Sequence, residues 1–122
     1  MSEVGVTLTD SNTYIKDVKA KIEVFLKERD WEKFHTPKNL ASSICIEAAE
    51  LLEIFQWMNE EEEKKMNTKI LQRVKEELAD VTIYCLSMAN NMNIDLTKAV
   101  LAKLSANENK YPVDKWKGKV NL

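Results

Sequence analysis

Residues 37–58, PKNLASSICIEAAELLEIFQWM, show the clearest helical pattern in the chain. Thr36 and Pro37 supply an N-cap and the preferred first-turn proline, and apolar side chains then recur with the spacing of one helix face. A second pattern of this kind covers residues 70–91 and ends in two asparagines, a residue type that can end a helix. The sequence therefore predicts two long helices with one apolar face each.

Two more segments precede and join these helices. Apolar residues at helical spacing predict a helix that begins at Asp10 or Ser11, as N-cap, and ends near Arg29. The charge run at residues 60–65 is most simply a solvated turn or a short helix, because such runs usually face water.

A fourth, shorter helix is expected near the C-terminus. Asp95 is a suitable N-cap, residues 96–104 carry the apolar pattern, and Tyr111-Pro112 is expected to break the chain direction. No internal repeat or strand-like alternation occurs in the sequence. The predicted fold class is all-α, a four-helix bundle.

Composition limits the classes of function. A length of 122 residues predicts one domain, residues 1–122, in which residues 1–9 and 112–122 are flexible or arm-like. The chain has 18 basic and 20 acidic side chains, a formal net charge of −2, so no nucleic acid partner is expected. The longest uncharged apolar stretch, residues 81–89, is too short to span a membrane, and residues 1–3 do not begin a signal peptide. We expect a cytoplasmic protein without a membrane partner.

Four carboxylates interrupt the apolar faces of the two long helices. Glu47 and Glu77 each occupy a position where the apolar pattern calls for a hydrophobic residue, and Glu50 and Asp80 follow three residues later on the same side. Buried carboxylates repel one another unless a positive charge lies between them. Oxygen ligands without cysteine or a paired histidine suit Mg²⁺ or Mn²⁺. The alternative is that these acids face solvent, since E-x-x-E occurs often on helices of a glutamate-rich chain.

Backbone amides alone are not expected to hold a phosphate group in this chain. The chain has only two glycines, Gly5 and Gly118, so the Gly-rich loops that hold phosphates in other folds are absent. A metal ion and side chains must hold any phosphate.

Four stretches in this order resemble the MazG-like all-alpha nucleoside triphosphate pyrophosphohydrolases, most closely their dCTP pyrophosphatase branch. They are ERDWEKFHTPKNL (28–40), IEAAELLEIFQW (46–57), EELADVTIYCL (76–86) and NENKYP (107–112). The resemblance covers roughly residues 15–119 and is more specific than either acidic pair alone.

The resemblance implies hydrolysis of a nucleoside triphosphate, with dCTP as a candidate, to monophosphate and pyrophosphate. It implies a Mg²⁺ ion, for which Mn²⁺ can substitute, held by Glu47, Glu50, Glu77 and Asp80. Glu53 follows Glu50 by one turn, and we expect it to orient or deprotonate the attacking water; the alternative is a solvent-facing Glu53.

The resemblance also implies substrate contacts from aromatic and polar residues. It assigns a base pocket to Trp31, Trp57 and Tyr84, and a C-terminal substrate segment to Lys103, Asn107, Lys110 and Tyr111. Packing in the core is the alternative for the aromatic residues.

Two positions near the predicted base pocket need separate treatment. We interpret His35 as a residue that fixes a loop rather than as a base, because it is far in sequence from both acidic pairs. Relatives carry a polar residue facing the base on the first helix, whereas this chain places Ile22 or a neighbour there, which bears on the choice of base.

Small helical domains often complete their cores by association, and the family resembled forms dimers or paired dimers. We expect a homodimer or homotetramer with substrate pockets at subunit boundaries and a role in clearing unwanted nucleotides. The main alternative is a non-enzymatic helical oligomerisation module with a structural metal site. A ferritin-like di-metal bundle would need Glu-x-x-His pairs, and His35, the one histidine, is not in such a pair.

Overall fold

A computed structural model describes residues 5–120, and the architecture over this range is all-helical, as predicted. The helices are α1 (Ile15–Glu28), α2 (Pro37–Phe55), α3 (Glu60–Lys64), α4 (Thr68–Asn91), α5 (Leu96–Lys110) and α6 (Val113–Trp116), with a 3₁₀ turn, η1 (Glu32–Phe34). The extreme ends of the predicted flexible segments, residues 1–4 and 121–122, lie outside the described range. No helix between residues 5 and 120 combines the length and the apolar character that a membrane crossing needs.

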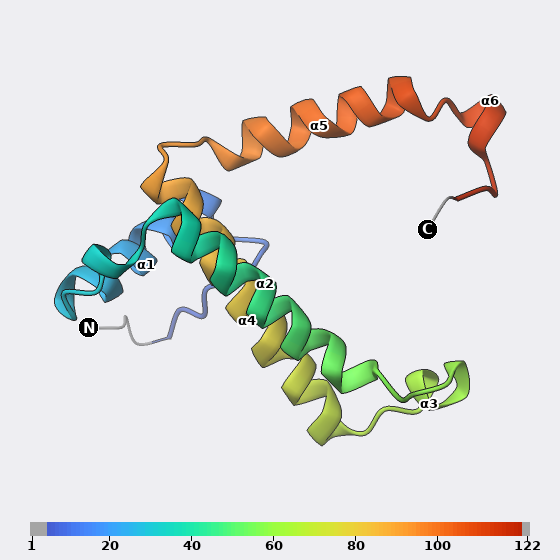
Figure 1. The fold of residues 1–122 in the computed structure, drawn as a ribbon, viewed down its shortest axis with the longest axis horizontal. Helices are drawn as coiled ribbons and strands as arrows, with labels where there is room; N and C mark the ends of the chain where they lie inside the picture. The colour runs from blue at the N-terminus through green and yellow to red at the C-terminus, as the bar shows by residue number, and fades with distance from the viewer. Residues whose placement is uncertain (1–4, 121–122) are drawn as a thin grey trace.

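The long helices α2 and α4 lie side by side and antiparallel, and this pair is the centre of the molecule (Figure 1). The short α3 lies at the turn that joins them. Helix α1 packs against α4 near the C-terminal end of α4 (Figure 1). The segments that lead into α2 and out of α4 therefore lie at the same end of the α2–α4 pair.

Side-chain N-caps, two of them predicted, explain where three helices begin. The Thr36 side chain accepts a hydrogen bond from the Asn39 amide, and Asp95 accepts one from the Lys98 amide. The side chain of Asn67 caps α4 in the same way. Each side chain satisfies an amide that would otherwise lack a partner at the start of its helix.

The predicted start of the first helix at Asp10 or Ser11 is wrong. Those two residues lie in a turn that the Asn12 side chain closes, accepting from the Thr9 amide at 2.7 Å and donating to the Thr7 carbonyl at 2.9 Å. A side chain that bonds the local backbone in this way competes with helix formation.

Other boundaries differ at the C-terminal ends of helices. Helix α2 ends at Phe55, before the predicted end at Met58, whereas α5 is longer than predicted and continues to Lys110. The sequence between residues 105 and 110 contains no helix breaker, and Tyr111 leaves the helix because it precedes Pro112. Helix α6 was not predicted.

The two asparagines at the end of α4 join three segments. The Asn90 side-chain amide donates to the Lys19 carbonyl of α1 at 3.0 Å, and the Asn91 amide donates to the His35 carbonyl at 2.8 Å. The chain then reverses through Asn93 with a φ of 56°, a left-handed conformation that asparagine tolerates. These bonds fix α1 and the η1 segment to α4.

The core of one chain is small. The buried apolar residues, all contributed by α1, α2 and α4, are Ile22, Leu40, Ile54, Leu86 and Ala89. Helix α5 projects from the α2–α4 pair and makes no comparable packing contact with another described helix, so the four-helix bundle stays a prediction for the single chain.

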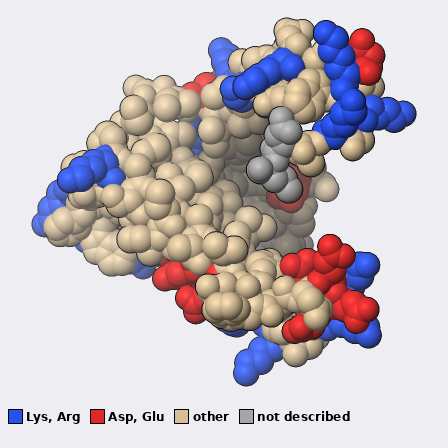
Figure 2. All heavy atoms as spheres, turned by 45° about the vertical axis from the view of Figure 1, so that its right-hand side comes forward, with Lys and Arg blue, Asp and Glu red and all other residues tan. Residues whose placement is uncertain are grey.

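The projecting helix gives the surface a hollow with differently charged borders. We call α5 and α6 together the C-terminal arm. Basic side chains gather on this arm, and acidic ones, with some basic neighbours, gather on the opposite side around α3 (Figure 2).

Candidate functional site

Three of the predicted metal ligands meet between α2 and α4. Glu47 lies on α2, and Glu77 and Asp80 lie one turn apart on α4. One carboxylate oxygen from each lies within 4.8 Å of the other two. Antiparallel packing of two helices that each carry an acid on the apolar face produces this convergence.

The environment of these acids is unfavourable for negative charge. Burial, followed by the neighbouring Glu50, Asp80 and Glu77, raises the pKa of Glu47 from 4.5 to about 7. Burial, followed by Glu50 and Asp80, also raises the pKa of Glu77. One oxygen each of Glu47 and Glu77 is buried without a hydrogen-bond partner. Such groups call for a cation or for protons.

The donor set fits a hard divalent cation. All three converging atoms are carboxylate oxygens, and the unpartnered oxygens of Glu47 and Glu77 can serve as ligands. Glu50 is exposed and outside the 4.8 Å group, but it lies close enough for its charge to raise the pKa of both glutamates. The four predicted ligands therefore share one electrostatic environment, while three of them are arranged around one point.

An apolar pocket of about 350 Å³ lies between α1, the η1 segment and α4. Trp31 and Tyr84, two of the three predicted base-pocket aromatics, line it, and so does Ile22, as the sequence indicated. The His35 ring lies 6.2 Å from the Tyr84 ring and also lines the pocket. The Nδ1 atom of the His35 ring is buried without a hydrogen-bond partner, and the bond that ties this residue to α4 is made by its backbone carbonyl, which accepts from the Asn91 side chain.

The pocket and the acids share a helix. Asp80, Tyr84 and Ser87 are spaced by four and three residues and so lie along one side of α4. Ser87 is seven residues beyond Asp80, roughly 10 Å along the helix axis. The acids and the pocket thus lie about two helical turns apart on one side of α4.

The remaining predicted residues are not part of this arrangement in a single chain. Trp57 is 87% exposed and does not line the pocket, and Glu53 is exposed on α2. The predicted substrate segment belongs to the projecting part of the chain, with Tyr111 packed edge-on against Trp116 at 5.1 Å. That segment consists of Lys103, Asn107, Lys110 and Tyr111.

Sequence reasoning missed the serine of the pocket. Ser87 is 4% exposed, and it stands in the apolar pattern of α4 as Glu47 and Glu77 do in theirs. A polar residue at a core position was therefore an available signal.

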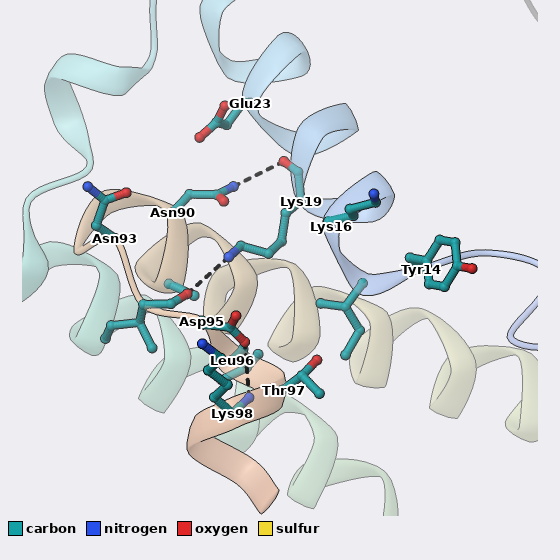
Figure 3. A pocket seen from close by; sticks show the side chains of 13 residues that line it. Tyr14, Lys16, Lys19, Glu23, Asn90, Asn93, Asp95, Leu96, Thr97 and Lys98 are labelled. Carbon is teal, nitrogen blue, oxygen red and sulfur yellow. Dashed lines mark hydrogen bonds between the residues drawn. The ribbon is translucent and has the colours of Figure 1, made fainter.

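A larger groove of about 550 Å³ lies between the start of α1 and the α4–α5 connection (Figure 3). The Lys19 amine donates to the Ile94 carbonyl there at 3.0 Å, and Asn90 donates to the Lys19 carbonyl (Figure 3). None of the predicted site residues lines it. We interpret this groove as the joint that sets the direction of α5.

Comparison with known proteins assigns the class. The family model described as "MazG-like family" matches residues 42–120, which include all four predicted metal ligands, and the chain belongs to this family.

Individual relatives agree with that assignment. The chain is 37% identical over 110 residues to "dCTP pyrophosphatase 1" of Bos taurus and 38% identical over 100 residues to the Homo sapiens protein of that name. These matches cover 88% and 80% of this chain but only 65% and 59% of the two relatives. The structure of this chain also resembles the crystal structure of a pyrophosphatase from Archaeoglobus fulgidus, with a TM-score of 0.72. The two sequences are 40% identical, and the match covers 87% of this chain and 99% of the other. The predicted resemblance is confirmed.

Proposed function

We propose that the protein is a Mg²⁺-dependent nucleoside triphosphate pyrophosphohydrolase that releases pyrophosphate and a nucleoside monophosphate. The observation that carries the proposal is the convergence of Glu47, Glu77 and Asp80, two of which keep a buried oxygen without a partner. A dCTP-like substrate is proposed because mammalian relatives are named dCTP pyrophosphatase. The proposed cellular role is removal of unwanted nucleotides in the cytoplasm.

The four acids would hold the ion. Mg²⁺ prefers carboxylate oxygens and completes its shell with water and substrate phosphates, which suits an open site with the exposed Glu50 and Asp80 at its border. When bound, the ion supplies positive charge that offsets the charge growing on the phosphate oxygens and makes water in the site more acidic.

Glu53 is the proposed proton acceptor. It follows Glu50 by three residues on α2, so its carboxylate lies one turn along the same side of the helix. Its exposure leaves it open to water. From there it can orient a water molecule toward the α-phosphorus and take its proton.

The pocket would hold the base. Trp31 and Tyr84 offer aromatic faces on which a base can stack, and Ile22 with its neighbours excludes water. Holding the base and the phosphates at two points along α4 fixes the α-phosphorus between them, which is the positioning component of catalysis.

A second copy of the chain would complete the site. The projecting α5 exposes Leu101 and Leu104 at 60% and 52%, and α2 exposes Leu52 at 64%, so both helices carry large apolar side chains that a partner could cover. Pairing of two chains as a homodimer, or of two dimers as a homotetramer, would bury these faces. We propose that Trp57, Lys103 and Lys110 reach the substrate across this boundary.

The test is pyrophosphate release from a panel of nucleoside triphosphates with Mg²⁺, with Mn²⁺ and with excess chelator. We expect turnover only with metal, and a loss of about 100-fold or more in Glu47→Gln, because one ligand of a shared ion is removed. The matched control is Glu76→Gln, the same change at an exposed acid next to Glu77 on α4. The Glu76 carboxylate accepts a hydrogen bond from the Gln72 side chain and is not among the predicted ligands.

Two results would count against the proposal. Turnover in excess chelator, or normal turnover in Glu47→Gln, would exclude the metal site as the catalytic centre. Metal binding without turnover of any triphosphate would favour the alternative, a helical oligomerisation module with a structural ion.

A further inference from the structure

The hydroxyl of Ser87 makes no hydrogen bond to another described residue. Its side chain is 4% exposed, lies on α4 and lines the apolar pocket, and its Oγ atom has no hydrogen-bond partner. Hydroxyls in helices usually bond the carbonyl four residues earlier. Thr82 does so to Leu78 at 2.8 Å, and Ser42 does so to Lys38 at 3.0 Å. Ser87 is different although it is more buried than either.

Ser87 lies between two cavities, the apolar pocket and a smaller polar cavity of about 90 Å³ that Glu23, Glu32, Asn90 and Asn91 also line. Ile22 and Ile83 line the apolar pocket beside it, together with aromatic rings. Among the described residues, the other buried polar atom without a partner in this pocket is Nδ1 of His35. Lys21 also lines the pocket, but its side chain is exposed. A buried hydroxyl that lacks a partner costs free energy, and a ligand that pairs with it recovers that cost.

We propose that Ser87 determines base specificity by hydrogen bonding the polar edge of the nucleobase. The inference rests on the proposed function, and it adds a residue and a role to it. Aromatic faces hold any base, because every base has a π-face, so stacking on Trp31 and Tyr84 does not by itself discriminate between bases. Discrimination needs a polar group directed at the edge, and α1 contributes the apolar Ile22 on its side of the pocket. Ser87 supplies that group from α4.

The position of Ser87 along α4 supports this role. It lies one turn beyond Tyr84 and two turns beyond Asp80 on the same side of the helix. A base that stacks on Tyr84 while its phosphates are held near Asp80 therefore presents its outer edge to Ser87. Ser87 does not contact the reacting phosphate, and its effect should be on binding of the base.

The test compares kcat/KM for the four common deoxynucleoside triphosphates in wild type, Ser87→Ala and Ser87→Cys. We expect kcat/KM for the best substrate to fall about tenfold, mainly through KM, because the base edge loses its partner. The values for poor substrates should change little, so the discrimination between bases shrinks. Cysteine keeps the size of the side chain but is a weak hydrogen-bond donor, so both variants should behave alike.

Ser42→Ala is the matched control, since it removes a helical hydroxyl that bonds its own backbone. It should leave the order of substrates unchanged. If Ser87→Ala changes kcat/KM by the same factor for all four substrates, or leaves it unchanged, the inference about Ser87 is overturned. The proposed function is untouched by that result, because the wild-type protein still turns over a triphosphate. No turnover of any triphosphate by wild type would overturn the proposed function, and this inference with it.

Discussion

Polar residues at apolar positions carry most of the functional information in this chain. Glu47 and Glu77 interrupt apolar patterns, and the structure brings them together with Asp80 around one point. The pattern predicted this because an acid on a core face needs a compensating charge. Ser87 interrupts its pattern in the same way and was missed, because a serine can bond its own helix and so looks harmless in a sequence.

The raised pKa of Glu47 predicts how the metal-free protein responds to pH. The folded-state pKa is about 7 against an ordinary value of 4.5, so the folded protein holds a proton that the unfolded chain releases between these values. Stability should therefore fall as pH rises from about 4.5 to about 7 and then level off. Thermal unfolding in chelator at a series of pH values measures this.

Glu47→Gln serves as the control for that prediction. Glutamine cannot titrate, so the variant should lose the part of the pH dependence that Glu47 contributes, while Glu77 keeps its own, and it should match or exceed wild-type stability near pH 7 without metal. A large loss of stability in Glu47→Gln would show instead that a structural partner holds the acid.

At the level of helices, the sequence predicted the order of the four main helices and the starts of α2 and α5. The caps at Thr36 and Asp95 lie where expected, because capping is a local interaction between a side chain and an amide three residues on. The beginning of α1 was not predictable in this way. There the side chain of Asn12 bonds the backbone of the preceding residues and holds Asp10 and Ser11 in a turn.

Removal of the α2 cap should destabilise the protein measurably. Thr36→Ala loses the bond that the Thr36 hydroxyl accepts from the Asn39 amide at 3.2 Å, and we expect a loss of about 1 kcal/mol in the free energy of unfolding. Urea unfolding measures it. Thr36→Ser, which keeps the hydroxyl, should stay close to wild type, and equal losses in both variants would contradict the role of the cap.

For the whole molecule, the direction of α5 could not be predicted from the sequence. The apolar pattern predicted a helix that closes a bundle, but α5 projects away from α2 and α4 (Figure 1). At the connection before α5, Lys19 donates to the Ile94 carbonyl, 75 positions away, and local patterns do not encode such a contact. The exposed apolar side chains of α5 and α2 are the reason to expect a second copy.

Mixing of two inactive variants tests whether the arm acts across the subunit boundary. Glu47→Gln lacks a predicted metal ligand, and a Lys103→Ala/Lys110→Ala variant lacks the two predicted substrate lysines of α5. If each site combines acids from one chain with lysines from the other, a mixed dimer contains one intact site. Refolding the two variants together should then restore about a quarter of wild-type activity, because half of the randomly formed dimers are mixed.

Native mass spectrometry provides the control for that experiment, since it shows whether mixed dimers form. Mixed dimers without recovered activity would mean that the lysines act on the site of their own chain or not at all.

The position of water attack tests the account of the chemistry. In the proposed site, which has no Gly-rich loop around the terminal phosphates, the acids with a bound ion and the lysines would hold the β- and γ-phosphates as the pyrophosphate leaving group, while Trp31 and Tyr84 would fix the base. That leaves the α-phosphorus nearest the water that Glu53 orients. Turnover of a deoxynucleoside triphosphate with Mg²⁺ in ¹⁸O-labelled water, followed by mass spectrometry of the products, identifies the phosphorus attacked. The account predicts label in the nucleoside monophosphate; label in pyrophosphate or in released orthophosphate would contradict it.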